Sequence, residues 1–258
     1  LKPKILLNFN YERQQWVRLC EPFFDVAEIH WIRFISKEED QAPKIKNHHY
    51  HYWSDFANAS EIIELIDPKL IVIMDNTAPL TLALLHSAKK NNITTYYLQH
   101  GVYVIYKDYR ILEKRLTINK SNFSDVKQVK SKVNFSTFQF IKNSLGFRLL
   151  SPFTLLYLFF SKLWGNRKAA YIFKDSLRIP DKYLCYSLQN ATIHKEIDGI
   201  SDDKIKLIGN PELQQIISNY RNATCSNSEQ YWLFVDQALS GSDIGESFIT
   251  KARHHKIY

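Results

Sequence analysis

The chain has 258 residues, of which 45% are hydrophobic, and a net charge of +8 at pH 7. This length suits one large domain or one and a half smaller ones, and the composition suits a globular core. The chain has only seven glycines and neither a Gly-x-Gly-x-x-Gly nor a Walker-type loop. The usual sequence support for a nicotinamide-dependent or P-loop enzyme is therefore missing.

The cysteine count and the net charge indicate the cellular compartment and the kinds of binding partner to expect. Three widely spaced cysteines indicate neither a disulfide framework nor a metal site, and they fit a reducing compartment. We find no signal peptide and no apolar run of 18 residues. No nucleic-acid-binding motif accompanies the basic residues, so nucleic acid is not an expected partner. A membrane surface or an anionic substrate explains the charge at least as well.

The first predicted strand is followed by a polar turn. Residues 4–9 have the pattern of a strand and residues 11–20 that of a helix. Asn8 and Asn10 lie in the turn between them, where either side chain could hydrogen-bond a ligand. Local turn bonding is the alternative for each residue alone. We predict both as substrate-binding residues at the edge where the strands end.

A second predicted strand, residues 27–35, precedes a polar segment, residues 36–53, that we predict as a loop. This segment contains His48, His49 and His51. No Cys, Asp or Glu supports these histidines at ligand spacing, so we expect an exposed histidine-rich loop and predict no metal site.

The most informative stretch runs from residue 67 to residue 101. A helix capped by Ser54 or Asp55 is expected to lead into it. Residues 70–74 form a continuous apolar run, as expected for a strand buried on both faces. A helix starting at Pro79 follows, and then a β-branched and aromatic strand. Such strand–helix–strand crossovers are nearly always right-handed, with parallel strands.

Polar residues gather where these two strands end: Asp75 and Asn76 follow one, and Gln99, His100 and Gly101 follow the other. Open parallel sheets bind ligands at this edge. Histidine titrates near neutrality, so we predict His100 as the catalytic base, with Asp75 as its orienting partner or as the base itself. Asn76, Gln99 and Gly101 are predicted to bind substrate. A structural His100 and a helix-capping Asp75 are the alternatives.

The α/β pattern breaks after Gly101. Residues 113–132 are basic with little periodicity and are predicted to be a solvated insertion. Residues 149–160 are intensely apolar, too few to span a bilayer, and flanked by Lys and Arg. Two interpretations of residues 149–164 are open. In the first, these residues lie in a membrane interface, where the flanking cations contact anionic lipid; in the second, they pack as buried helices over the sheet.

The α/β pattern resumes at residue 182 and reaches Gly209, Asn210 and Pro211, which we predict as a hinge or turn. Residues 221–258 are predicted to be a linker and the beginning of an incomplete carboxy-terminal, donor-side domain, because about 50 more residues would be needed to bury such a sheet. Residues 1–220 then form the amino-terminal, acceptor-side domain, with an insertion at about 105–175.

In order and spacing, these motifs resemble the GT-B glycosyltransferases of bacterial surface (capsule and lipopolysaccharide) polysaccharide synthesis. They are also similar in architecture to the UDP-N-acetylglucosamine 2-epimerases. The matching residues are Asp67-Pro68-Lys69 through Asp75, then Leu98-Gln99-His100-Gly101, and finally Gly209-Asn210-Pro211. The resemblance implies a Rossmann-like parallel sheet flanked by helices, with a helical hydrophobic insertion and the start of a second Rossmann-like domain.

The resemblance also implies a function. A sugar would pass from a nucleotide-sugar donor to a growing glycan or lipid-linked acceptor, with inversion and without a metal or any cofactor besides the donor. The amino-terminal domain would hold the acceptor and supply the base. The protein would be cytoplasmic or peripheral on the cytoplasmic face of the inner membrane. Two alternatives are open: a non-hydrolysing sugar-nucleotide epimerase and a binding module without chemistry.

Overall fold

The computed structural model describes residues 2–12, 14–33, 37–38, 40–99, 137–146, 151–210 and 217–218. The strands are β1 (Lys4–Asn8), β2 (Glu28–Arg33), β3 (His49–Tyr52), β4 (Leu70–Ile73), β5 (Thr94–Leu98), β6 (Lys182–Cys185) and β7 (Ile205–Leu207). The helices are α1 (Gln14–Phe24), α2 (Ala59–Ile66), α3 (Pro79–Lys90), α5 (Thr137–Leu145), α6 (Pro152–Trp164), α7 (Asn166–Ile172) and α8 (Leu188–Asp198). Short 3₁₀ turns are η1 (Trp53–Asp55), η3 (Ser176–Arg178) and η4 (Asp202–Lys204).

The chain divides into two compact units, Leu1–Tyr106 with Ser131–Ile216 and Lys107–Lys130 with Ile217–Tyr258. Every element named above belongs to the first unit. The second unit falls outside the described residues except for 217–218, and so does the predicted beginning of a carboxy-terminal domain at 221–258.

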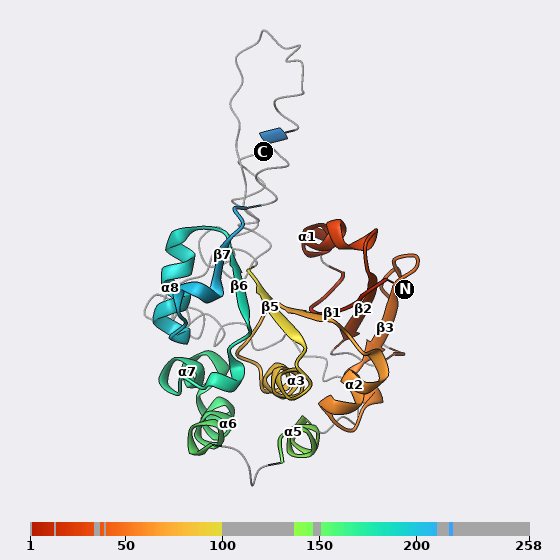
Figure 1. Ribbon diagram of the computed structural model, residues 1–258. Helices are drawn as coiled ribbons and strands as arrows, with labels where there is room; N and C mark the ends of the chain where they lie inside the picture. The colour runs from red at the N-terminus through yellow and green to blue at the C-terminus, as the bar shows by residue number, and fades with distance from the viewer. Residues whose placement is uncertain are drawn as a thin grey trace, which may run out of the picture. The chain divides into compact units, whose positions relative to one another are not determined.

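The seven strands form one parallel sheet in the order β3-β2-β1-β4-β5-β6-β7 (Figure 1). The order reverses between β1 and β4, which pair side by side although β2 and β3 lie between them in the sequence. This is a Rossmann-like α/β fold, and it confirms the predicted parallel sheet flanked by helices.

Both faces of the central strands are buried, which explains their continuous apolar runs. Along β1, Leu6 belongs to one core, with α2, α3 and α7, while Ile5 and Leu7 belong to the other core, with α1. The helices accordingly lie on both sides of the sheet (Figure 1).

The helix before β4 starts later than the sequence analysis predicts. Neither Ser54 nor Asp55 caps it, because both lie in η1. Asn58 is the N-cap of α2: its side chain accepts a hydrogen bond from the Glu61 amide, and the Glu61 carboxylate accepts one from the Ala57 amide. The pair is similar to a capping box, except that the carboxylate binds the amide of Ala57, one residue before the N-cap.

The prediction of a loop over residues 36–53 is wrong at its end, because β3 forms there and pairs in parallel with β2. The strand is short, lies at the sheet edge and alternates His and Tyr, so it lacks the apolar run that marks a buried strand. Its aromatic residues nevertheless suit a pleated surface.

The apolar insertion is helical, as predicted. α5 packs on α3 and α2 through Phe140 and Leu145, and α6 packs on α7, so that α5 and α6 lie outside the helices that cover the sheet (Figure 1). Tyr157 and Thr154 form the buried side of α6. Within the described part of the chain, no helix is both long enough and apolar enough to cross a membrane.

Candidate functional site

The strand order reverses between β1 and β4, and ligands of open α/β sheets bind at the carboxyl ends of the strands at such a point. Asn8 ends β1 there, opposite Ile73 of β4. Its side chain is buried, and Nδ2 donates to Thr81 Oγ1 at 3.2 Å. Oδ1 of Asn8 has no hydrogen-bond partner among the described residues. A buried carbonyl oxygen without a partner is costly, so Asn8 offers an acceptor that a bound ligand would satisfy.

Asp75 is the exposed acid of this edge. Its Oδ1 accepts hydrogen bonds from the amide and the hydroxyl of Thr77, both at 2.7 Å. The alternative that Asp75 caps the following helix is wrong, because the N-cap of α3 is Ala78. Asp75 instead closes a tight Asx turn, which holds an exposed carboxylate in a defined place just past β4.

Two predicted substrate-binding residues are buried and bonded within the fold. Asn76 donates to the hydroxyl of Tyr183 at 2.9 Å, and Gln99 accepts from the amide of Tyr186 at 2.9 Å. Both bonds join the ends of β4 and β5 to β6 and its loop. The roles of Asn76 and Gln99 toward a substrate stay predictions. His100 and Gly101 lie outside the described residues.

The sequence analysis missed a network of charged and aromatic side chains at the ends of β2 and β3. Its centre is Asp40, whose carboxylate is fully buried and accepts hydrogen bonds from the hydroxyls of Tyr11 and Tyr52, each at 2.8 Å, and from Lys44. Burial opposes ionisation of Asp40, but these hydrogen bonds outweigh it and hold the pKa of the carboxyl below its usual value.

Arg33, the last residue of β2, connects this network to the turn after β1. Its guanidinium donates to Asn10 Oδ1 at 3.1 Å and to Glu12 at 2.5 Å, and it lies 4.3 Å from the centre of the Tyr11 ring. The hydrogen bond from Arg33 also lowers the pKa of Glu12. The cations of the network are matched by carboxylates, so its chemical effect is to order the turn that carries Asn8 and Asn10.

No local signal in the sequence points to this network. Asp40 and Lys44 lie in a polar stretch without periodicity, and Arg33 ends a strand that mixes polar and apolar residues. Only the pairing of β3 beside β2 brings Tyr52 to Asp40.

The predicted hinge begins just after the last strand of the sheet. Gly209 follows β7 with φ of +70°, a conformation that favours glycine, and Asn210 is exposed. Pro211 lies outside the described residues. The hinge role of these residues stays a prediction.

An acid that the sequence analysis did not connect with the histidines of β3 lies beside one of them, His49. Ligand atoms of Glu28, His30 and His49 all lie within 4.8 Å of one another. Burial lowers the pKa of His30, and burial together with the neighbouring histidines lowers that of His51 to about 4, so both imidazoles are neutral at pH 7.

An apolar groove lies between α5 and α6. Its volume is about 680 Å³, and its lining includes Phe138, Leu155, Phe159 and Leu163, together with Pro79 at the start of α3. Tyr157 of α6 donates a hydrogen bond to the carbonyl of Thr77. The groove and α6 therefore adjoin the turn that Asp75 closes.

No protein-family profile matches this chain, and no curated protein matches its sequence. Among solved structures, the chain is similar to the Bordetella bronchiseptica enzyme WbmH, crystallised in complex with NAD+. The sequences are 12% identical, the TM-score is 0.28, and the match covers 38% of this chain and 39% of WbmH. The chain thus spans less than half of the length of that enzyme, and a likeness this distant carries no functional argument.

Proposed function

We propose that this chain is the acceptor-side part of a GT-B-type glycosyltransferase, which moves a sugar from a nucleotide sugar to a lipid-linked or growing bacterial surface glycan. The observation that carries the proposal is the pair of groups at the strand reversal. Asp75 presents an exposed carboxylate after β4, and Asn8 has a buried acceptor at the end of β1 that none of the described residues uses. A sugar substrate whose hydroxyl attacks needs a base for that hydroxyl, and a hydrogen-bond acceptor can hold a neighbouring hydroxyl in place.

The reaction assigns a role to each group. The acceptor hydroxyl attacks the anomeric carbon from the side opposite the nucleoside diphosphate, which leaves with the bonding electron pair. As the new bond forms, the hydroxyl proton passes to the base, His100 in this proposal. Asp75 orients the imidazole and stabilises the imidazolium that results, or takes the proton itself. Donor binding belongs to the carboxy-terminal domain that the resemblance implies.

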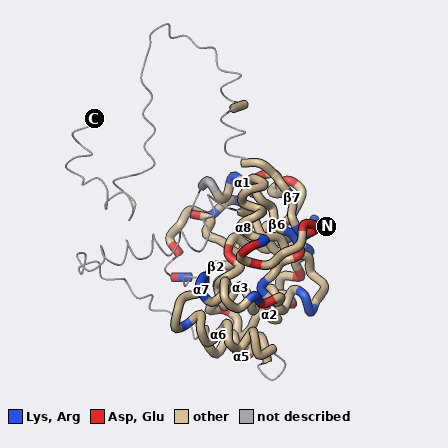
Figure 2. The backbone as a smooth tube through the Cα atoms, turned by 90° about the vertical axis from the view of Figure 1, so that its left-hand side faces the viewer, with Lys and Arg blue, Asp and Glu red and all other residues tan. Residues whose placement is uncertain are grey.

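The exposed side of α6 supports a lipid-linked acceptor. Phe153, Phe159 and Leu163 are 63%, 60% and 61% exposed. Phe159 and Leu163 continue from Leu155 at intervals of four residues, which is the spacing of one helix face, and Phe153 lies in the first turn of α6. Few charges interrupt α5 and α6 (Figure 2). Lys162 lies in the last turn of α6, and Lys168 of α7 lies 4.8 Å from the centre of the Trp164 ring at the end of α6. A helix with apolar side chains facing out and cations beside them is typical of a membrane interface.

The apolar groove between α5 and α6 extends from the exposed side of α6 to the start of α3, close to the strand ends where the reaction is proposed. An acyl or prenyl chain can occupy an apolar space of this size, while the sugar that it carries extends toward the polar strand ends. Because α6 is bonded to the Asp75–Thr77 turn, a protein docked through α6 would hold that turn near the membrane surface.

We expect the protein to co-sediment with vesicles that contain anionic phospholipid, and we expect added salt to weaken the electrostatic part of this binding. Replacing both Phe153 and Phe159 with glutamate should abolish sedimentation, because it removes the inserted side chains and adds repulsion. The matched control is Leu188→Glu on α8, which changes a side chain that is 67% exposed elsewhere in the fold. Equal sedimentation of the double variant and the control would exclude α6 as the membrane-binding face.

The activity itself is tested with the full-length protein, labelled nucleotide sugars and a membrane extract as the acceptor source. Label in the lipid or glycan fraction supports transfer. Label in a changed nucleotide sugar identifies an epimerase instead, and no conversion with any donor overturns the proposal. Asp75→Asn is the site variant, and Asp55→Asn, an exposed acid in η1, is its control.

A further inference from the structure

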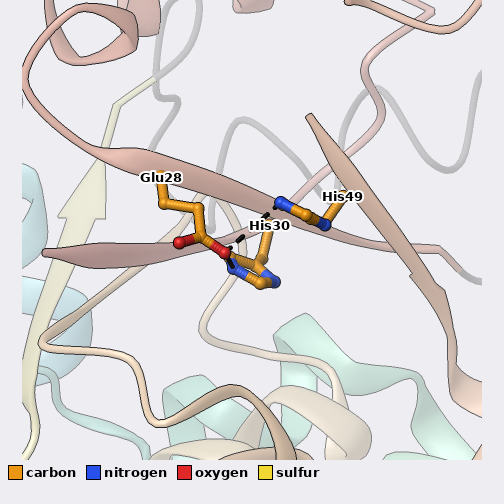
Figure 3. Close-up of side chains that lie close together, drawn as sticks. All are labelled: Glu28, His30 and His49. Atoms are coloured by element: carbon orange, nitrogen blue, oxygen red, sulfur yellow. Dashed lines mark hydrogen bonds and ion pairs between the residues drawn. The ribbon is translucent and has the colours of Figure 1, made fainter. Parts of the chain in front are cut away.

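Four polar side chains share one face of the β2–β3 pair. Glu28 and His30 are two residues apart on β2, and His49 and His51 are two residues apart on β3, so each pair points to one side of the sheet. His30 lies opposite His49 in the register. Figure 3 shows Glu28, His30 and His49 converging from the two strands.

The distances are close to those of a coordination shell. Oε1 of Glu28 lies 2.9 Å from Nε2 of His30 and 3.3 Å from Nε2 of His49. Two nitrogens and one carboxylate oxygen around a tetrahedral zinc, with bonds of about 2.0–2.2 Å, lie roughly 3.4 Å from one another. Little movement is therefore needed around Glu28.

We propose that Glu28, His30 and His49 bind one Zn²⁺ ion through the carboxylate and the two Nε2 atoms. This donor set, two imidazoles and one carboxylate, is a common protein environment for zinc, with a fourth position left for water. Glu28 bears the negative charge that the cation needs, and its side chain is 34% exposed, which leaves a path for the ion to enter.

One ring has to turn for both imidazoles to bind. The rings of His30 and His49 are stacked, with centroids 4.6 Å apart and planes inclined by 16°, whereas a metal lies in the plane of each imidazole that binds it. His49 is the ring that turns, because its side chain is 52% exposed on the edge strand, while that of His30 is buried.

His51 completes the arrangement as a positioning residue. Its Nε2 lies 3.0 Å from Nδ1 of His30. When Nε2 of His30 binds the ion, its Nδ1 carries the proton and donates to His51, and this bond fixes the ring orientation. Partners of this kind recur around zinc-binding histidines, and their loss typically weakens metal affinity by about 10–100-fold.

The ion would join the edge strand to the rest of the sheet. β3 is hydrogen-bonded to one neighbour, β2, and it carries Tyr52, which donates to Asp40 at the other end. His30 and Arg33 are three residues apart, so the ion would lie roughly 10 Å from the polar network along the strand. The role of the ion is thus structural, and the zinc proposal does not depend on the glycosyltransferase proposal.

The test uses the purified full chain after chelator treatment, titrated with Zn²⁺ alone by calorimetry and followed by thermal unfolding. We expect one equivalent to bind and, at about 100 times Kd, a rise in Tm of roughly 5–10 °C. His49→Ala and Glu28→Gln should each remove the zinc-dependent rise, and His51→Gln should weaken binding about 10–100-fold. Without zinc, His49→Ala should change Tm little, because His49 is largely exposed.

His86→Ala is the matched control, because His86 is a half-buried histidine on α3, outside the cluster. It should bind zinc like the parent protein. The proposal is overturned if the parent binds no zinc, if His49→Ala and Glu28→Gln keep the parent affinity, or if His86→Ala loses as much affinity as they do.

Discussion

Replacing His100 with alanine in the full-length protein is expected to lower turnover by about 10²–10⁴-fold while leaving Tm unchanged. The size follows from the contribution of a positioned general base to proton transfer. His100 directly follows Gln99, which is bonded at the end of β5, and β5 pairs with β4, which leads to Asp75. A base on this edge can reach a hydroxyl bound near the strand reversal.

Two quantities are measured together, because loss of a catalytic histidine lowers turnover alone, whereas loss of a structural histidine lowers Tm as well. Turnover per folded molecule and Tm are recorded for His100→Ala and for Asp75→Asn. If Asp75 orients the imidazole, Asp75→Asn should have the smaller effect on turnover. Near-normal turnover in His100→Ala, or a loss that matches lost folding, would remove His100 as the base and leave Asp75 as the candidate.

The second large effect is expected at a buried ion pair between Arg178 of η3 and Asp198 of α8. The guanidinium of Arg178 donates to Asp198 at 2.5 Å and to the carbonyl of Ala170 at 3.0 Å, and His194 contacts the second oxygen of Asp198 at 3.1 Å. All three of these charged or titratable side chains are fully buried. The group joins η3 to α7 and α8.

Asp198→Ala is expected to lower the free energy of unfolding by about 3–5 kcal/mol, because it leaves the guanidinium of Arg178 buried without its counter-charge. Urea denaturation measures the change. Asp202→Asn is the control, because Asp202 is 84% exposed and its pairing with Lys195 is at the surface. A surface pair is worth at most about 1 kcal/mol. Equal losses in the two variants would contradict the role assigned to the buried pair.

The same group gives stability a defined pH dependence. Burial by itself would raise the pKa of Asp198, but the hydrogen bond from His194 and the charge of Arg178 hold it below its usual value. A carboxyl with a depressed pKa contributes its full stability above the pKa of the unfolded chain and loses it as the pH falls through the folded value. The stability of the parent should therefore fall more steeply than that of Asp198→Ala below about pH 4.

Local patterns were enough to predict the centre of the fold. The apolar run of β4, Pro79 at the start of α3 and the aromatic strand β5 are all where the sequence analysis expects them. Each is specified by neighbours in the sequence: a strand buried on both faces has to be apolar throughout, and proline suits the first turn of a helix. The parallel order of β4 and β5 follows from the handedness of crossovers.

Other features depend on which strands pair, and parallel pairing joins residues far apart in the sequence. β3 reads as a loop because an edge strand with polar residues lacks an apolar run, and only its register beside β2 brings His49 to Glu28 and Tyr52 to Asp40. The bonds of Asn76 and Gln99 likewise depend on β6 lying next to β5. The sequence alone therefore determined which residue types gather at the carboxyl ends of the strands. The tertiary structure decided which of these side chains are bonded within the fold and which face outward, because those contacts depend on strands that are distant in the sequence.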